Sequence, residues 1–206
     1  MPTSLYMTAT RILACLAALA ALGFYFGPHR NLEADEAELA TIAGVIAGRD
    51  VGISCPGTLG TLTEVSAQDG SVVFSSDGKP ADEARLSGDT CKTLRSFLHG
   101  GVSGLGCLVR HGGCPLEVRE AAIAVNVLSH EAWHLAGVRD EAATQCYALQ
   151  TNAYTAMRLG ASADEARAIS GFILREVQPA LPADYRTRDC HDGGPLDLDP
   201  DEPSWP

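Results

Sequence analysis

One long segment constrains the fold of this chain more than any other. Pro115 precedes it, and residues 116–136 contain neither proline nor glycine, so the segment predicts one uninterrupted helix. Gly137 follows at the position where a helix C-cap glycine is expected. One face of the helix carries Ile123 and Val127, which predicts an apolar stripe packed against the rest of the domain.

The last turns of this helix carry the motif H-E-x-x-H in His130, Glu131 and His134. On a helix the two histidines lie one turn apart and share a face. Two imidazoles on one face can bind one Zn²⁺, and Glu131 then lies beside the metal, where it can accept a proton from water. The sequence therefore predicts a zinc centre with His130 and His134 as ligands and Glu131 as the catalytic base.

A zinc site needs a third protein ligand, and two neighbouring acids compete for the role. A second helix is predicted from Glu141 to about Leu159, and Asp140 has the side-chain chemistry of its N-cap. Glu141 is then the first helical residue, and its carboxylate is free to face back across the turn. We expect Glu141 to be the third ligand and Asp140 to be its cap, with Asp140 as the alternative ligand.

An H-E-x-x-H helix followed by a Glu on the next helix resembles the gluzincin class of zinc metallopeptidases. In the ImmA/IrrE-like branch of that class the second helix reads roughly E-x-x-A-N-x-F-A. The residues that approximate this pattern are Glu141, Thr144, Gln145, Tyr147 and Ala148. The resemblance covers about residues 115–160, and it implies a zinc-dependent hydrolase that acts on a peptide or protein substrate.

A rival resemblance is to the snapalysin-type secreted proteases, whose metzincin-like pattern H-E-x-x-H-x-x-G-x-x-D would make Asp140 the ligand. A metzincin should next show a Met-containing turn, whereas Met157 lies in a segment that predicts helix. The wider pattern, which ends in residues 190–198, resembles a group of exported H-E-x-x-H proteins of high-GC bacteria that have no assigned substrate.

Other residues are candidates for supporting roles around the metal. Asp140 and Asn126 are the candidates for orienting the imidazoles through hydrogen bonds. The candidates for stabilising the oxyanion of a tetrahedral intermediate are Tyr147, Tyr154, Arg139 and His191. The sequence does not choose among them.

The chain is expected to be α+β and mostly α. The elements predicted before the motif helix are a helix over residues 32–48, a strand over 50–54, a hairpin of 62–66 with 71–75 around Asp69-Gly70, and a helix that begins at Thr90 with Asp89 as its cap. The resemblance implies a minimal zincin-like core, made of the H-E-x-x-H helix, the following Glu helix and a small β-hairpin layer.

An apolar run from Ile12 to Gly27 follows Arg11, and no convincing cleavage site comes after it. Residues 1–30 are therefore expected to be an uncleaved signal anchor of a single-pass membrane protein, with a cleaved signal peptide and secretion as the alternative. Residues 31–189 then form an extracytoplasmic metallopeptidase-like domain. Residues 190–206 are an acidic Pro/Asp-rich tail, disordered by default unless Cys190 anchors it.

The cysteines give an independent argument for export. Seven are present, and one, Cys15, lies in the apolar run. An even number of remaining cysteines in an exported domain predicts disulfides, although spacing alone allows many pairings. Proximity in the sequence favours Cys107–Cys114. The remaining cysteines are then paired as Cys55–Cys91, within the first half of the domain, and Cys146–Cys190.

The charge balance excludes one class of partner. The chain has 26 acidic and 15 basic residues, for a net charge of −11, and no stripe of basic side chains. A nucleic-acid-binding surface needs such a stripe to neutralise phosphates. We therefore expect no nucleic-acid partner.

Overall fold

The computed structural model describes residues 33–56, 69–109, 113–201 and 205. The fold is α+β and mostly helical, with one small sheet of three strands. The expected fold class is therefore confirmed at this level.

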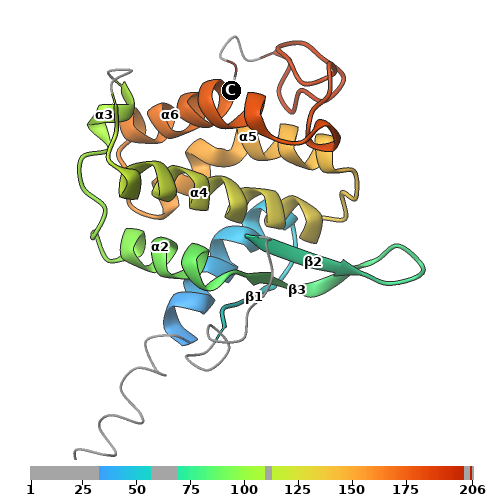
Figure 1. Ribbon diagram of the computed structural model, residues 1–206. Helices are drawn as coiled ribbons and strands as arrows, with labels where there is room; N and C mark the ends of the chain where they lie inside the picture. Colours follow the sequence, from blue (N-terminus) through green and yellow to red (C-terminus); the bar gives the residue numbers. More distant parts are fainter. Residues whose placement is uncertain (1–32, 57–68, 110–112, 202–204, 206) are drawn as a thin grey trace, which may run out of the picture.

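The motif helix, α4 (Leu116–Leu135), lies at the centre of the described structure. Figure 1 shows α5 (Glu141–Arg158) and α6 (Ala163–Phe172) on one side of it, and α2 (Gly88–Leu98) and the sheet on the other. Because α4 is packed on both sides, most of its circumference is buried rather than a single stripe. The residues that make this close packing feasible are mainly small, namely Ala121, Ala122, Ala124, Ser129 and Ala132.

The sheet has the order β1-β3-β2, with β1 (Gly52–Ser54) parallel to β3 (Pro80–Leu86) and β2 (Gly70–Phe74) antiparallel to it. The strand β2 is therefore at the edge of the sheet, and it pairs on one side within the described chain. Ala84 of β3 and Ile53 of β1 are buried against the helices, whereas Val73 of β2 is 65% exposed.

The hairpin differs from the expected one. The strand β2 overlaps the expected run 71–75 but starts at Gly70, which was expected in the turn. It pairs with β3, through a turn in which Ser75 N–H donates to Lys79 O and Gly78 has a φ of +83°. The other expected strand, residues 62–66, lies outside the described residues. The sequence analysis missed β3 because Pro80 and its alternating charged residues are typical of a loop. Those charges face solvent while Ala84 and Leu86 face the core.

The remaining elements are short, apart from a helix over residues 33–47 that contributes Leu39, Ile42 and Ala43 to the core. They are α3 (Gly106–Val109), the π-helical turn η1 (Ile173–Val177), and the 3₁₀ turns η2 (Gln178–Ala180) and η3 (Ala183–Tyr185).

The helix termini follow their capping chemistry. The Asp140 carboxylate accepts from Ala143 N–H at the start of α5, as expected. Ser162 and Glu165 form the capping box of α6. The expected cap of α2 was wrong, since Ser87 caps it and Asp89 lies in the first turn, where its charge favours the positive end of the helix dipole.

Among the described residues three disulfides are present, and they match the expected pairs: Cys55–Cys91, Cys107–Cys114 and Cys146–Cys190. The first joins the chain after β1 to α2, and the second joins α3 to the residues before α4. The third ties the C-terminal segment to α5. Each therefore fixes a connection that has little hydrophobic surface of its own.

The described part of the C-terminal tail is docked rather than disordered. The Gln150 side chain donates to Leu196 O at 2.9 Å, and its amide oxygen accepts from Leu198 N–H at 2.8 Å. Together with the Cys146–Cys190 disulfide, these bonds hold the segment against α5 (Figure 1).

The expected membrane anchor requires correction. In the described parts of the chain, no helix combines enough length with enough apolar character to cross a bilayer. Even α4, with 20 residues, carries Glu117, Arg119 and Glu120 near its start. The apolar run 12–27, on which the expectation of a single-pass protein rested, lies outside the described residues.

Replacing Cys55 and Cys91 together by Ala should lower the free energy of unfolding by about 3–4 kcal/mol, because the cross-link restricts a long loop in the unfolded chain. The matched control is the Cys107/Cys114 double replacement, which opens a shorter loop and should cost only about 2 kcal/mol. Urea-induced unfolding followed by circular dichroism measures both. A larger loss for the shorter loop would contradict the argument.

Candidate metal centre

Three side chains that could bind one metal ion converge at the end of α4. One ligand atom from each of His130, His134 and Glu141 lies within 4.8 Å of the others. In the structure Glu141 Oε2 lies 3.0 Å from His130 Nε2 and 3.3 Å from His134 Nε2. Both histidines are buried, while Glu141 is partly exposed. The geometry brings together the three residues that the sequence analysis selected.

The turn between α4 and α5 creates this convergence. Gly137 has a φ of +100°, a backbone conformation that side chains disfavour, and this reverses the chain after the motif helix. Val138 N–H donates to Trp133 O, which closes the helix end. The Asp140 cap then starts α5 so that its first residue, Glu141, faces the two imidazoles. Asp140 itself is occupied by the cap bond and is exposed.

Hydrogen bonds to the far side of each ring orient the imidazoles. His130 Nδ1 donates to Gln145 Oε1 at 3.1 Å, and His134 Nδ1 donates to Val138 O at 2.7 Å. With the proton held on Nδ1, each Nε2 keeps its lone pair for the shared site. This arrangement is the one that a metal-binding pair of histidines requires.

A network of buried amides supports Gln145. Its side chain exchanges two hydrogen bonds with Asn126, at 3.3 and 3.2 Å, and Asn152 donates to the same Asn126 oxygen at 3.1 Å. The sequence analysis named Asn126 as a residue that orients the imidazoles, and the structure places it one step further away, behind Gln145. Asp140, the other candidate for that role, contacts neither ring nitrogen in the described structure.

Glu131 is buried beside the three candidate ligands, with 5% of its surface exposed. Burial, assisted by the nearby charge of Glu141, raises the pKa of Glu131 to about 8. Its Oε2 atom is buried and has no hydrogen-bond partner in the described structure. A buried carboxyl group without a partner is costly, and a metal ion with its water is the kind of ligand that would satisfy it.

The candidate ligands favour the protonation states that metal binding needs. Burial lowers the pKa of His134, so this imidazole is neutral near pH 7. The contacts with His130 and His134 lower the pKa of Glu141, which remains ionised. Two imidazoles and one carboxylate form a donor set of the catalytic zinc type, so the residues present fit Zn²⁺.

A cavity of about 290 Å³ gives access to the site. The residues that line it are Gly70, Ser71, Val72, Phe74, His130, Glu131, His134, Arg139, Glu141 and Tyr185. One wall is thus the edge strand β2. Gly70 is required there, because a Cβ at this position would lie 2.6 Å from Glu131 Oε1.

Tyr185 is a site residue that the sequence analysis missed. Its ring stacks on His130, with centroids 5.5 Å apart and an interplanar angle of 25°. Burial and the charge of Glu141 raise the pKa of Tyr185, so the phenol keeps its proton and can donate a hydrogen bond. No local motif marks it, because the docked C-terminal segment brings η3 across the chain to the end of α4.

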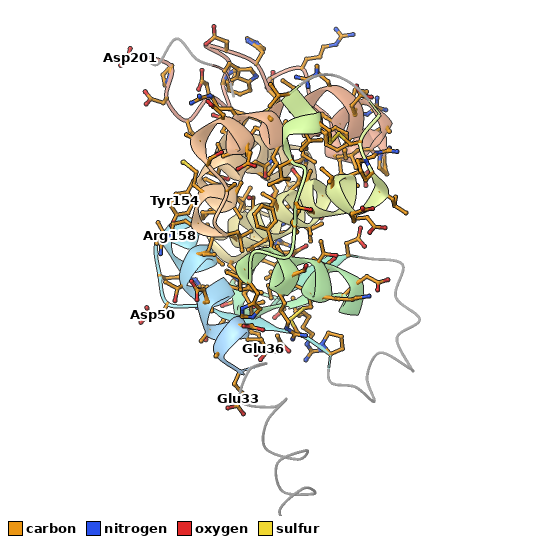
Figure 2. All side chains as sticks on the ribbon, turned by 90° about the vertical axis from the view of Figure 1, so that its left-hand side faces the viewer. Glu33, Glu36, Asp50, Tyr154, Arg158 and Asp201 are labelled. Carbon is orange, nitrogen blue, oxygen red and sulfur yellow. A yellow bond between two sulfur atoms is a disulfide. The ribbon has the colours of Figure 1, made fainter. Side chains whose placement is uncertain are left out.

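The other candidates for an oxyanion donor lie elsewhere, with one exception. Tyr147 packs against Trp133, with ring centroids 4.8 Å apart. Tyr154 lies beside Arg158 on α5, as Figure 2 shows. His191 is exposed and donates to Asp192 O within the tail. Only Arg139 of these candidates lines the cavity.

Replacing Gln145 by Leu should lower the zinc affinity of the chain about 10–100-fold, because His130 loses the acceptor that fixes its ring. Replacing Gln150 by Leu, on the opposite, tail-binding side of α5, is the matched control and should leave the affinity unchanged. Competition with a zinc-sensitive dye measures both constants. Equal affinities for wild type and Gln145→Leu would show that the amide does not support the site.

The stability of the metal-free chain should fall as the pH rises from about 5 to 8. The folded state keeps the proton on Glu131 up to a pKa of about 8, whereas the unfolded state releases it near 4.5. The stabilising effect is therefore complete below pH 4.5 and is lost by about pH 8, for a cost of roughly 3–5 kcal/mol. Urea unfolding at several pH values measures it. Glu131→Gln should remove this component, and identical pH profiles for both proteins would contradict the assignment.

Comparisons of the chain with protein-family models, with curated proteins and with solved structures found no match. The resemblance to zinc metallopeptidases therefore stands on the motif residues and the donor set of this chain alone.

Proposed function

We propose that this protein is a zinc-dependent peptidase of the H-E-x-x-H type with a minimal zincin-like core. His130, His134 and Glu141 hold the metal, and Glu131 is the general base. The observation that carries the proposal is the convergence of these three donors within 4.8 Å, beside a buried acid whose second oxygen has no partner.

A structural zinc site is the alternative, and the donor set favours the enzyme. Structural sites are closed by four protein ligands, whereas catalytic sites leave one position for water or substrate. Among the described residues the group has three members, and a cavity leads to it. The buried Glu131 has no role in a closed site that would offset the cost of burying it.

Zinc, when bound, supplies a Lewis acid that lowers the pKa of water and polarises a carbonyl. The protein supplies the proton transfers. Glu131 accepts the proton of the attacking water and passes it to the leaving amine. In the metal-free chain burial raises its pKa to about 8, so the carboxyl group holds a proton near pH 7. Positive charge next to Glu131 lowers its pKa, so the carboxyl group becomes a base when the site is filled.

Two further features of the cavity support peptide hydrolysis. Tyr185 carries a protonated phenol over His130, where it can donate to the oxyanion that forms from the scissile carbonyl. The strand β2 is an edge strand along the cavity, and an extended peptide can add to such an edge through main-chain hydrogen bonds. The substrate class that fits is therefore a peptide in an extended conformation.

The three disulfides favour an oxidising compartment outside the cytoplasm as the place of action. A zinc site without cysteine ligands is compatible with that compartment, since it has no thiolate to oxidise.

The deciding experiment replaces Glu131 by Gln in the full chain. The variant should retain about one zinc per chain, because Glu131 is not a ligand, but should lose hydrolysis of a mixed peptide library by at least about 100-fold, as expected for a general base. Metal analysis and mass spectrometry of the library measure the two results. Wild-type protein that binds zinc and cleaves no peptide would favour the structural site, and unchanged cleavage by the variant would exclude this mechanism.

Gly70→Ala provides a second arm of the same test. Its Cβ would overlap the Glu131 carboxyl group, so either the acid or β2 must shift. Hydrolysis should fall while the zinc content remains that of the wild type. The control is Gly113→Ala, at an exposed glycine that has open space around it, no positive φ and no place in the cavity lining.

A further inference from the structure

Arg139 is the one permanent cation among the residues that line the metal cavity. It follows the turn at Gly137 and is exposed at the cavity mouth. In a chain with a net charge of −11, an arginine beside a site that contains Glu131 and Glu141 needs an explanation.

The guanidinium is held by an aromatic ring and has no carboxylate partner within the described residues. Its Cζ lies over the Phe74 ring, 5.4 Å from the centroid. Two acids in the neighbouring turns have other partners. Asp77, in the adjacent hairpin turn, binds Lys79 at 3.0 Å and accepts from the Ser75 hydroxyl, and Asp140 caps α5. A guanidinium packed on a ring keeps its N–H edges free for a carboxylate.

The position of Glu131 orients a substrate along β2. The base delivers its proton to the leaving amine, so the amine half of a peptide lies toward Glu131 and the adjacent Gly70. Phe74, at the other end of β2, packs edge-on against His134, with ring centroids 5.9 Å apart. The acyl half of the peptide therefore runs toward Phe74 and Arg139.

We propose that Arg139 determines specificity by binding an acidic side chain in the acyl half of the substrate peptide. This proposal rests on the proposed function and adds the substrate class to it. The Phe74 ring lies between the guanidinium and His134. Its centroid is 5.9 Å from the His134 ring centroid and 5.4 Å from Arg139 Cζ. An extended chain advances about 3.3 Å per residue, so an acid within about three residues of the scissile carbonyl reaches Arg139.

The surface next to the Gly70 end of β2 is acidic. A second cavity, of about 640 Å³, has Asp69, the residue before Gly70, in its lining. Its charged lining residues are Asp69, Asp89, Glu117, Glu120 and Lys92. This excess of carboxylates repels an acidic side chain on the amine side. An acidic residue therefore favours one placement of the peptide, with its carboxylate toward Arg139.

The test measures binding rather than turnover, so it is independent of catalysis. The probes are acetyl-Glu-Gly hydroxamate and acetyl-Gln-Gly hydroxamate, together with the shorter acetyl-Glu and acetyl-Gln hydroxamates. The hydroxamate binds the metal, and the acetylated residues occupy the acyl side. Titration calorimetry on the zinc-loaded full chain should give an affinity about tenfold higher for a Glu probe than for its Gln partner, as a charge-assisted pair provides. The ratio should decrease with added salt.

Arg139→Gln should bring the Glu/Gln ratio to about one without changing the affinity for the Gln probes. Arg139→Lys should retain part of the ratio, since it keeps the charge but loses the planar fork. The matched control is Arg158→Gln, which removes an exposed arginine on α5 (Figure 2) and should leave the ratio at the wild-type value.

Each other outcome is decisive. Equal affinities in the wild type, an unchanged ratio in Arg139→Gln, or binding of no probe would overturn the proposal. A second probe pair, N-mercaptoacetyl-Glu amide and N-mercaptoacetyl-Gln amide, occupies the amine side, and a Glu preference there would also overturn it. A Glu preference on the acyl side without cleavage of any peptide would leave the Arg139 proposal standing and reject only the proposed function.

Discussion

The short reversal between α4 and α5 is the constraint on which the rest of the site depends. Gly137, with its left-handed backbone, ends the motif helix three residues after His134, and Asp140 starts the next helix with Glu141 as its first member. A longer connection would let Glu141 sample many positions, at an entropic cost to metal binding. The tight turn places the third donor against the two imidazoles before any ligand arrives.

Burying the polar side chains of the site costs free energy of folding, and hydrogen bonds among the neighbouring side chains offset part of that cost. Glu131 is buried without a partner for Oε2, and the interface of α4 with α5 contains amides and hydroxyls where a purely structural interface would be apolar. Those groups satisfy one another, as in the Asn126–Gln145 pair and the bond between Ser129 and Thr155. The Asn126–Gln145 pair thereby orients His130 and satisfies its own polar atoms, whereas Asn152 Oδ1 has no partner in the described structure.

Local chemistry accounts for what could be predicted from the sequence, and its failures have local causes too. Asp140 and the Ser162–Glu165 box were predictable because a cap acts within three residues. The strand β3 was not predicted, because its charged, solvent-facing residues outnumber Ala84 and Leu86, the two buried residues that mark its apolar face. The helix α2 is capped by Ser87 rather than Asp89, because two residues with capping chemistry stand close together and the sequence alone does not choose between them.

The sequence by itself determined the donor set: periodicity places His130 and His134 on one face, and the neighbouring cap places Glu141 beside them. Only the tertiary structure decided what surrounds that set. Gln145, Gly70 and Tyr185 reach the site from α5, β2 and η3, and no sequence spacing links those elements to the motif. Contacts within a helical turn are fixed by the period of the helix, whereas contacts between distant segments depend on how the whole chain packs.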